Sequence, residues 1–135
     1  MTIQPYLFFD GRCEEAIDFY RRTIDARVTQ LMRFKDVPNA CSPGTQQENK
    51  IMHASLQVRG ATILASDGEC QGKANFDGFG LSLQAPNDSE AERLFGALSD
   101  GGAVRMPMTK TFFASKFGMV KDRFGVTWMV LAGGA

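Results

Sequence analysis

The 135-residue sequence predicts an α+β fold in which two βαβββ modules follow one another along the chain. Apolar residues alternate in several short segments, as in strands, and two longer segments show the 3.6-residue period of amphipathic helices. The segment Glu90–Phe95 repeats the pattern of Glu15–Tyr20 about 75 residues later. Because an internal repeat constrains a fold more strongly than any single element, we expect the same module twice.

The first module is expected to span about residues 1–68. Apolar residues between Cys13 and Ile24 recur at i, i+3, i+4 and i+7, which predicts an amphipathic helix with Asp10 as its N-cap. Strands are expected where apolar side chains alternate or form short runs bounded by turn residues, at 3–9, 27–34, 50–58 and 61–66. The polar segment 35–49 is expected to be a long loop.

The second module is expected over about residues 76–132. A capping box of Asn87 and Glu90 opens its helix, and the pair Gly101–Gly102 ends it. By the same criteria as before, its strands are expected at 79–85, 103–106, 116–120 and 126–132. The segment 107–114 begins with a proline and is expected to be irregular.

One helix can cover only one face of a four-stranded sheet, so each module should leave its other sheet face bare. Two such faces are expected to form a curved mixed sheet around a cleft. Small-molecule sites are usually concave and mostly apolar, with a few polar groups that fix orientation. The predicted cleft is therefore the place where a ligand is expected.

Composition excludes several classes of protein. Fifteen basic and fifteen acidic residues cancel, which disfavours a nucleic-acid partner. No apolar run approaches the roughly 20 residues of a membrane span, and the N-terminal segment does not resemble a signal peptide. The three cysteines are widely spaced, which favours reduced thiols in the cytoplasm.

Three segments carry a resemblance to a known family: Pro5–Ala16 followed by Phe19–Tyr20, then Ile51–Leu56, then Phe117–Met129. In this order they resemble PhnB-like proteins of the vicinal oxygen chelate superfamily, which includes glyoxalase I, bleomycin-resistance proteins and extradiol dioxygenases. The resemblance implies paired βαβββ modules and a homodimer. Such proteins are often described as ubiquinone-pathway methyltransferases, but the sequence has no Gly-rich loop after a strand that would hold a nucleoside cofactor.

The resemblance also implies a divalent metal held by His, Glu or Gln side chains from the first and last strands of each module. In this sequence those positions fall on Pro5, the segment Leu64–Ser66, Gly80 and Met129. None of these supplies the carboxylate or imidazole that such a cation prefers. We therefore expect no metal and no other cofactor.

His53 is the single histidine and the one candidate catalytic residue. Strand alternation places it with Ser55 on the face opposite Ala54 and Leu56. It could anchor a ligand or act as a general base. It could equally make a structural hydrogen bond to a neighbouring strand. A cysteine thiol could also act as a nucleophile with His53 as its base, and Cys41 is the best-placed cysteine for this. The alternative is that the thiols have no catalytic role.

The remaining site candidates are the side chains expected to line the cleft. Its polar groups would be His53, Ser55 and Ser82, and its apolar lining would be Phe9, Phe113, Trp128 and Met129. The alternative is that these aromatic residues form the core or a dimer interface. The leading hypothesis is binding of a small, largely apolar molecule without a metal. The alternatives are a metal-dependent lyase, isomerase or dioxygenase with an atypical ligand set including His53, and a non-catalytic structural or interaction dimer.

Overall fold

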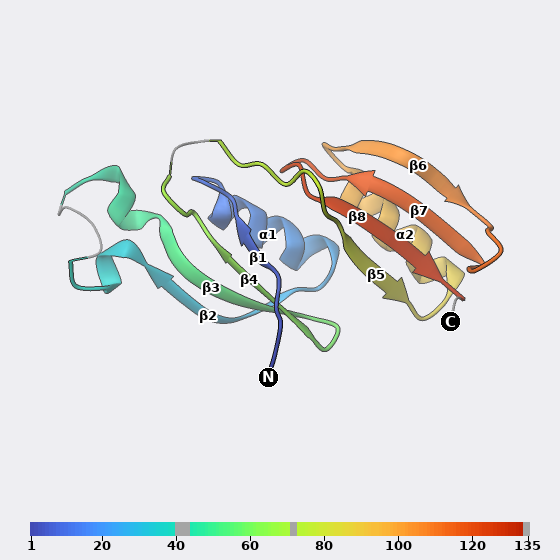
Figure 1. Ribbon diagram of the computed structural model, residues 1–135, viewed down its shortest axis with the longest axis horizontal. Helices are drawn as coiled ribbons and strands as arrows, with labels where there is room; N and C mark the ends of the chain where they lie inside the picture. The colour runs from blue at the N-terminus through green and yellow to red at the C-terminus, as the bar shows by residue number, and fades with distance from the viewer. Residues whose placement is uncertain (40–43, 71–72, 134–135) are drawn as a thin grey trace. The chain divides into compact units, whose positions relative to one another are not determined.

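The computed structural model describes residues 1–39, 44–70 and 73–133 and contains two βαβββ modules (Figure 1). The chain divides into two compact units, Met1–Ala74 and Asn75–Ala135. Each unit has one four-stranded sheet and one α-helix. The predicted α+β class and the repeated module are thus confirmed. No helix in the described part of the chain combines the length and apolar character needed to cross a membrane.

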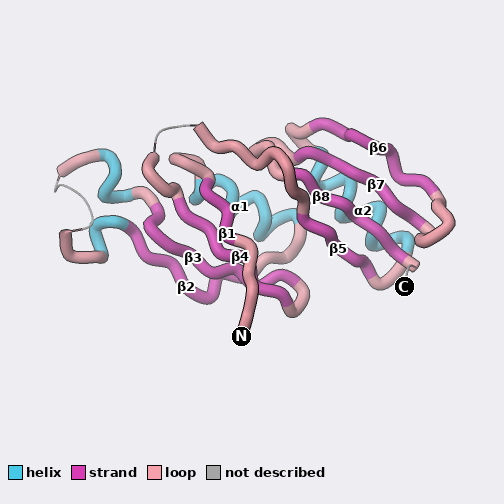
Figure 2. The backbone as a smooth tube through the Cα atoms, in the orientation of Figure 1, coloured by secondary structure: helices cyan, strands magenta, loops and turns pink. Residues whose placement is uncertain are grey.

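The first unit is a mixed sheet with one helix (Figures 1 and 2). Its elements are β1 (Tyr6–Phe8), α1 (Cys13–Thr23), β2 (Arg27–Arg33), β3 (Ile51–Val58) and β4 (Ala61–Ser66). The strand order is β1-β4-β3-β2, with β1 parallel to β4 and the other neighbours antiparallel. Two short 3-10 helices, η1 (Phe34–Asp36) and η2 (Gln46–Asn49), lie in or next to the segment expected to be a loop.

The helix α1 buries the apolar stripe that the sequence predicts. Cys13, Ala16 and Tyr20 are each at most 1% exposed. Ala54 and Leu56 of β3 are equally buried. Because side chains alternate along a strand, the residues between them point to the other face, which α1 does not cover.

A buried carboxylate ties α1 to the sheet. Asp67 directly follows β4 and is only 1% exposed. One carboxylate oxygen accepts hydrogen bonds from the backbone N–H groups of Gly11 and Cys13, both at 2.8 Å. The other accepts from the N–H of Ile51 at 2.8 Å. Asp67 thus satisfies three donors from two segments far apart in the chain and places a negative charge at the N-terminus of α1.

The expectation that Asp10 caps α1 is therefore wrong. The N-cap position is Arg12, which makes no side-chain cap bond, and the capping oxygen comes from Asp67. Asp10 instead accepts a hydrogen bond from the backbone N–H of Lys73 at 2.6 Å. Local sequence patterns reveal only caps supplied by residues next to a helix, whereas this acceptor lies more than fifty positions away in the chain.

An ion pair joins the start of α1 to the end of β2. The guanidinium of Arg33 donates to the Glu14 carboxylate at 2.6 Å and to the Asn49 carbonyl at 2.6 Å. These bonds lower the pKa of Glu14 and raise the pKa of Arg33. The Glu14 side chain is 59% exposed, so solvent screens much of the attraction.

The second unit repeats the first, with elements β5 (Leu81–Ala85), α2 (Asp88–Ser99), β6 (Ala103–Thr109), β7 (Lys116–Lys121) and β8 (Thr127–Ala132). Its strand order, β5-β8-β7-β6, has the same form as that of the first unit. The expected cap of α2 is confirmed, because the Asn87 side chain accepts from the N–H of Glu90 at 2.8 Å. A Cβ on Gly118 would lie 2.7 Å from the ring of Phe95, so this glycine lets α2 pack closely on β7.

The strand β6 continues past the point where the sequence predicted its end. It reaches Thr109, and Pro107 lies within it. Proline is tolerated because β6 is an edge strand, so its missing N–H removes no bond to a further strand. The register shifts on both sides of Met106, which marks the local irregularity.

The hairpin between β7 and β8 is also organised by a buried aspartate. Asp122 is 3% exposed and accepts from the backbone N–H groups of Phe124 at 2.9 Å and Val126 at 3.1 Å. Its second oxygen accepts from the indole N–H of Trp128 at 2.9 Å. The turn therefore has its buried donors paired within the hairpin.

Replacing Asp67 by alanine should destabilise the chain by about 3–5 kcal/mol, because the buried N–H groups of Cys13 and Ile51 and the partly buried N–H of Gly11 lose their acceptor. Urea unfolding measures this. Asp18→Ala, at an exposed position of α1, is the control and should stay within about 0.5 kcal/mol of the parent. A cost for Asp67→Ala below about 1 kcal/mol would contradict the role assigned to this carboxylate.

Replacing Glu14 by glutamine should cost less than about 1 kcal/mol at neutral pH. Because the folded-state pKa of Glu14 is lowered, its contribution is present above the unfolded-state pKa and is lost as pH falls through the folded-state pKa. A double-mutant cycle with Arg33→Gln, measured at neutral pH and well below the ordinary glutamate pKa of about 4.3, checks this. An equal coupling energy at both pH values would refute the assignment.

Candidate functional site

The candidate site lies on the face of the first sheet that α1 leaves bare. Tyr6 and Phe8 point to this face from β1, and His53 and Ser55 point to it from β3. Register places Leu64 of β4 between them, because it pairs with both Tyr6 and Ser55. The predicted position of His53 and Ser55 opposite Ala54 and Leu56 agrees with the burial pattern. The bare face therefore combines aromatic, aliphatic and neutral polar side chains.

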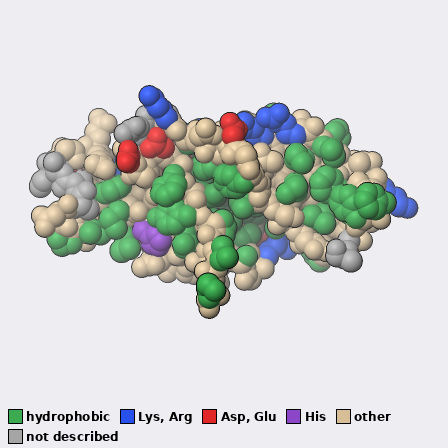
Figure 3. Space-filling model, in the orientation of Figure 1, with side chains coloured by type: hydrophobic (Ala, Val, Ile, Leu, Met, Phe, Trp, Pro, Cys, Tyr) green, Lys and Arg blue, Asp and Glu red, His purple; other side chains and the backbone are tan. Residues whose placement is uncertain are grey.

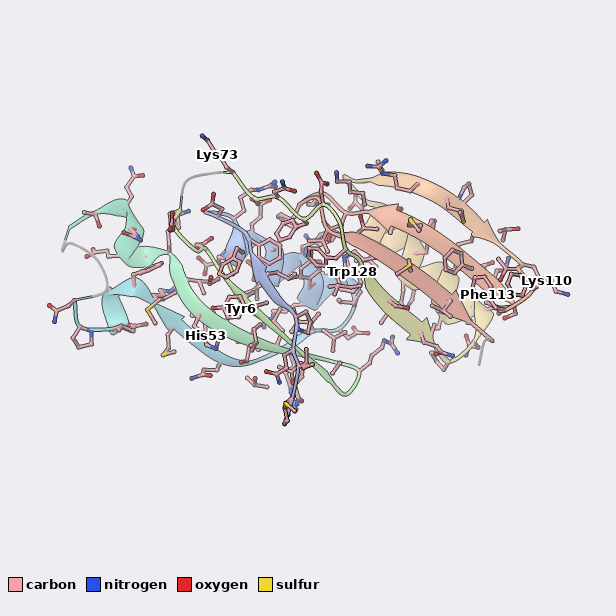
Figure 4. The ribbon with its side chains drawn as sticks, in the orientation of Figure 1. Tyr6, His53, Lys73, Lys110, Phe113 and Trp128 are labelled. Atoms are coloured by element: carbon pink, nitrogen blue, oxygen red, sulfur yellow. The ribbon has the colours of Figure 1, made fainter. Side chains whose placement is uncertain are left out.

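Tyr6 and His53 form a hydrogen-bonded pair on this face (Figure 4). The Tyr6 hydroxyl lies 3.0 Å from Nδ1 of His53, and the ring centroids are 5.6 Å apart. Among the described residues, no other forms a hydrogen bond to the His53 ring, and the half-buried side chain leaves Nε2 without a protein partner there. The partner of His53 that sequence analysis lacked is thus a tyrosine from another strand.

Phe8 extends the aromatic surface. Its ring stacks on Tyr6 with centroids 4.8 Å apart and an interplanar angle of 28°, yet 56% of the residue is exposed. Phe8 also lines a pocket of about 330 Å³ together with Asp10, Gly68, Glu69 and Lys73. Figure 3 shows the histidine at the surface beside hydrophobic side chains. An exposed, stacked pair of aromatic rings is a ready surface for a flat apolar ligand.

In the second unit, the bare face of the sheet carries a row of methionines. Cross-strand register pairs Met106 with Met119, Met119 with Met129, and Met129 with Ser82. Met129 and Ser82, two of the expected site residues, are therefore neighbours on one face. Thioether side chains are flexible and polarisable, so such a row adapts to ligands of different shape.

Phe113 lies in the loop before β7, next to two further phenylalanines. Its ring contacts Phe112 at a centroid distance of 5.1 Å and Phe117 at 5.2 Å. The loop residues line a second pocket of about 490 Å³, which also includes Lys110 and Ser115. Phe113 is 43% exposed, and its place in the apolar lining of a ligand site stays a prediction.

Phe9 and Trp128 differ from expectation. Each is 2% exposed and lies in a core rather than on a bare face. The Phe9 ring lies 6.1 Å from that of Tyr20 in α1, and Trp128 donates to Asp122. This placement corrects the expectation that they line a pocket. Both residues instead agree with the alternative given above, in which the aromatic side chains pack in the core.

The thiols give little support to a Cys–His nucleophile. Cys13 is fully buried, and burial is the main cause that raises its pKa. Burial, followed by the Asp67 charge, also raises the pKa of Cys70. Both shifts disfavour the reactive thiolate. Cys41, the preferred candidate, lies outside the described residues.

The positions expected to hold a superfamily metal do not fit one. Alternation places Tyr6, not Pro5, on the bare face of the first sheet, where it pairs with Leu64. The corresponding pair in the second unit is Ser82 with Met129. Neutral hydroxyl, alkyl and thioether groups are poor ligands for a hard divalent cation. Over the described ranges, no three His, Cys, Asp or Glu side chains are grouped as a metal site requires.

Comparison with known proteins places this fold and these motifs in a family. The model of the family described as 3-demethylubiquinone-9 3-methyltransferase matches residues 1–131. The chain belongs to this family, whose description is also carried by the PhnB protein of Bacillus cereus. The resemblance inferred from the three sequence segments is confirmed.

Individual relatives agree with this assignment. Protein YjdN of Escherichia coli is 36% identical over 138 residues, covering 96% of this chain and 94% of YjdN. The structure of protein PA1353 from Pseudomonas aeruginosa is 40% identical, with a TM-score of 0.82 over 98% of this chain and 97% of that one. The PhnB protein from Bacillus cereus is 25% identical, with a TM-score of 0.80 over 98% and 99%.

A more distant structure shows the fold alone. The glyoxylase/bleomycin resistance protein/dioxygenase domain from Frankia is 14% identical, with a TM-score of 0.65 over 98% of this chain and 92% of that one. The glyoxalase-like fold predicted from the repeat and the resemblance is therefore confirmed.

Sequence analysis missed Tyr6 and Phe8 as site residues. Alternation in β1 was the available signal, since it separates Tyr6 and Phe8 from Leu7 and Phe9. The run of aromatic and aliphatic residues hid this alternation, because both sets of side chains are apolar. Only the burial of Leu7 and Phe9 shows which set faces outward.

Replacing Trp128 by phenylalanine should destabilise the chain by about 1–3 kcal/mol, because the buried Asp122 oxygen loses its indole donor. Ligand affinity on the bare faces should not change. Urea unfolding and a binding titration measure the two effects separately. Weaker binding at unchanged stability would contradict the core role of Trp128.

Proposed function

We propose that this chain binds a small, largely apolar molecule, without the divalent metal of its superfamily, and that His53 is the polar anchor. The observation that supports this most directly is the partly exposed surface formed by Tyr6, Phe8 and His53, in which two stacked rings adjoin a histidine whose Nε2 has no partner among the described residues. Ser55 adds a second polar group on the same face. This composition, mostly apolar with a few fixed polar groups, is typical of small-molecule sites.

The second unit supports the same function through different side chains. Its methionine row and the Phe113 loop offer adaptable apolar surface, with Ser82 as a neutral polar neighbour. The proposal assigns these residues a share in ligand binding. It includes a homodimer, which the resemblance implies, and a cytoplasmic location, which the widely spaced cysteines favour. The exposure of Phe112 (101%) and Val104 (49%) supports this, because large apolar residues that remain exposed often contact a partner.

The proposal concerns binding rather than a reaction. The family description names methyl transfer, but two four-stranded sheets with one helix each differ from the doubly wound sheet that holds nucleotide cofactors. The metal-dependent alternative gains no support either. His53 is engaged at Nδ1 by Tyr6, and the positions around it carry no carboxylate ligand.

His53→Ala should weaken binding of any ligand found for this site by about tenfold, because one hydrogen bond of about 1.5 kcal/mol is lost. A thermal-shift screen of quinones, aromatic acids, thiol adducts and antibiotics supplies the ligand. A compound present at 100 times its Kd should stabilise the chain by about 2.7 kcal/mol. Gln57→Ala, farther along the same strand, is the matched control and should keep full affinity.

Two results would overturn this function. Absence of any thermal shift across the panel would favour a structural or interaction dimer. Stoichiometric zinc, nickel, manganese or iron in protein purified without a metal-affinity tag would contradict the metal-free proposal. Unfolding of His53→Ala would point to a structural histidine. In that case His53→Gln, which keeps a donor and similar bulk, should restore folding with reduced affinity.

A further inference from the structure

We infer that the ligand of the Tyr6–His53 site is a planar aromatic molecule bearing a hydrogen-bond acceptor oxygen, a carbonyl or a carboxylate, and that Tyr6 enforces this choice by fixing the proton of His53 on Nε2. This inference rests on the proposed function, because it names the ligand class of the same site. It adds a specificity-determining role for Tyr6, which touches His53 directly at 3.0 Å.

The hydrogen bond between Tyr6 and His53 decides which ring nitrogen carries the proton. A phenol hydroxyl is a good donor and an unprotonated imidazole nitrogen is a good acceptor. The described residues offer the Tyr6 hydroxyl no acceptor other than Nδ1. The Tyr6 hydroxyl therefore donates its hydrogen bond to Nδ1 of His53. In neutral imidazole the single ring proton is then on Nε2.

The open nitrogen is then a donor. Neutral His53 presents Nε2–H to the bare face, and protonated His53 also has a proton on Nε2. Only the tautomer in which Nδ1 donates to the Tyr6 oxygen would make Nε2 an acceptor. A ligand group opposite Nε2 must therefore accept a hydrogen bond, as a carbonyl or carboxylate oxygen does. An amine at this position would place donor against donor.

The surroundings of His53 select a flat ring. Phe8 and Tyr6 stack nearly parallel, and Phe8 is more than half exposed, so a further ring can continue the stack. Met32 is the cross-strand partner of His53 on β2, and Leu64 lies beside Tyr6 on β4. These four side chains carry no charge, and the charged groups Asp10, Glu69 and Lys73 line the separate pocket next to Phe8. An aromatic body with one acceptor oxygen matches this distribution of groups.

The first test needs no ligand. Because the chain has a single histidine, long-range ¹H–¹⁵N spectra of ¹⁵N-labelled protein report the His53 tautomer without overlap. The expected result is the Nε2–H form in the parent chain and a shift toward mixed tautomers in Tyr6→Phe. Gln57→Ala should leave the imidazole signals unchanged. A predominant Nδ1–H form in the parent chain would overturn the inference.

The second test compares three probes at neutral pH: 2-naphthoate, 2-naphthylmethylamine and cyclohexanecarboxylate. 2-Naphthoate shares its aromatic ring with the amine and its carboxylate with cyclohexanecarboxylate. We expect 2-naphthoate to bind at least about tenfold more tightly than the other two. Tyr6→Phe should reduce its advantage over the amine severalfold while keeping the ring stack. Phe8→Leu should reduce its advantage over cyclohexanecarboxylate.

The outcomes separate this inference from the proposed function. Tighter binding of the amine, or equal binding of all three probes at this face, would refute the inference while leaving small-molecule binding intact. A preference for 2-naphthoate that survives unchanged in Tyr6→Phe would refute the role of Tyr6. Absence of binding by all three, together with a silent thermal-shift panel, would overturn the proposed function and with it the ligand class.

Discussion

The Asp67 carboxylate holds together the segments on which the first unit depends. It follows β4 and accepts hydrogen bonds from Gly11 and Cys13 at the start of α1 and from Ile51 at the start of β3. These bonds fix the chain that leaves β1 against the chain that enters β3. Tyr6 and Phe8 lie on β1 and His53 lies on β3, so the same constraint sets the spacing of the candidate site.

The second unit uses the same principle in another place. Asp122 pairs the buried donors of the β7–β8 hairpin and binds the indole of Trp128. Gly118 then lets α2 approach the sheet closely. In both units the side chains on the helix-covered face of the sheet are buried against the helix, and the buried polar side-chain groups of the described residues are hydrogen-bonded. The bare faces carry the side chains that are free to take on a function, which is why the site is sought there.

The sequence predicted most elements because their patterns are local. Alternation located β3 and β4, and the Asn87 cap located α2. It could not identify Asp67 as a cap, because that contact joins residues far apart in the chain. It placed Phe9 and Trp128 in a pocket because aromatic character alone does not distinguish a core residue from a ligand-facing one. The Tyr6–His53 pair was out of reach for a similar reason, since the two residues lie on non-adjacent strands.

The central claim is that the bare face of the first sheet receives a small aromatic ligand. Isotope-filtered nuclear Overhauser spectra of the chain with unlabelled 2-naphthoate test it most directly, because they report which protein protons lie next to the bound ring. The account predicts cross-peaks from the naphthalene protons to the rings of Tyr6, Phe8 and His53. Cross-peaks confined to the second unit or to residues beside α1 would contradict it.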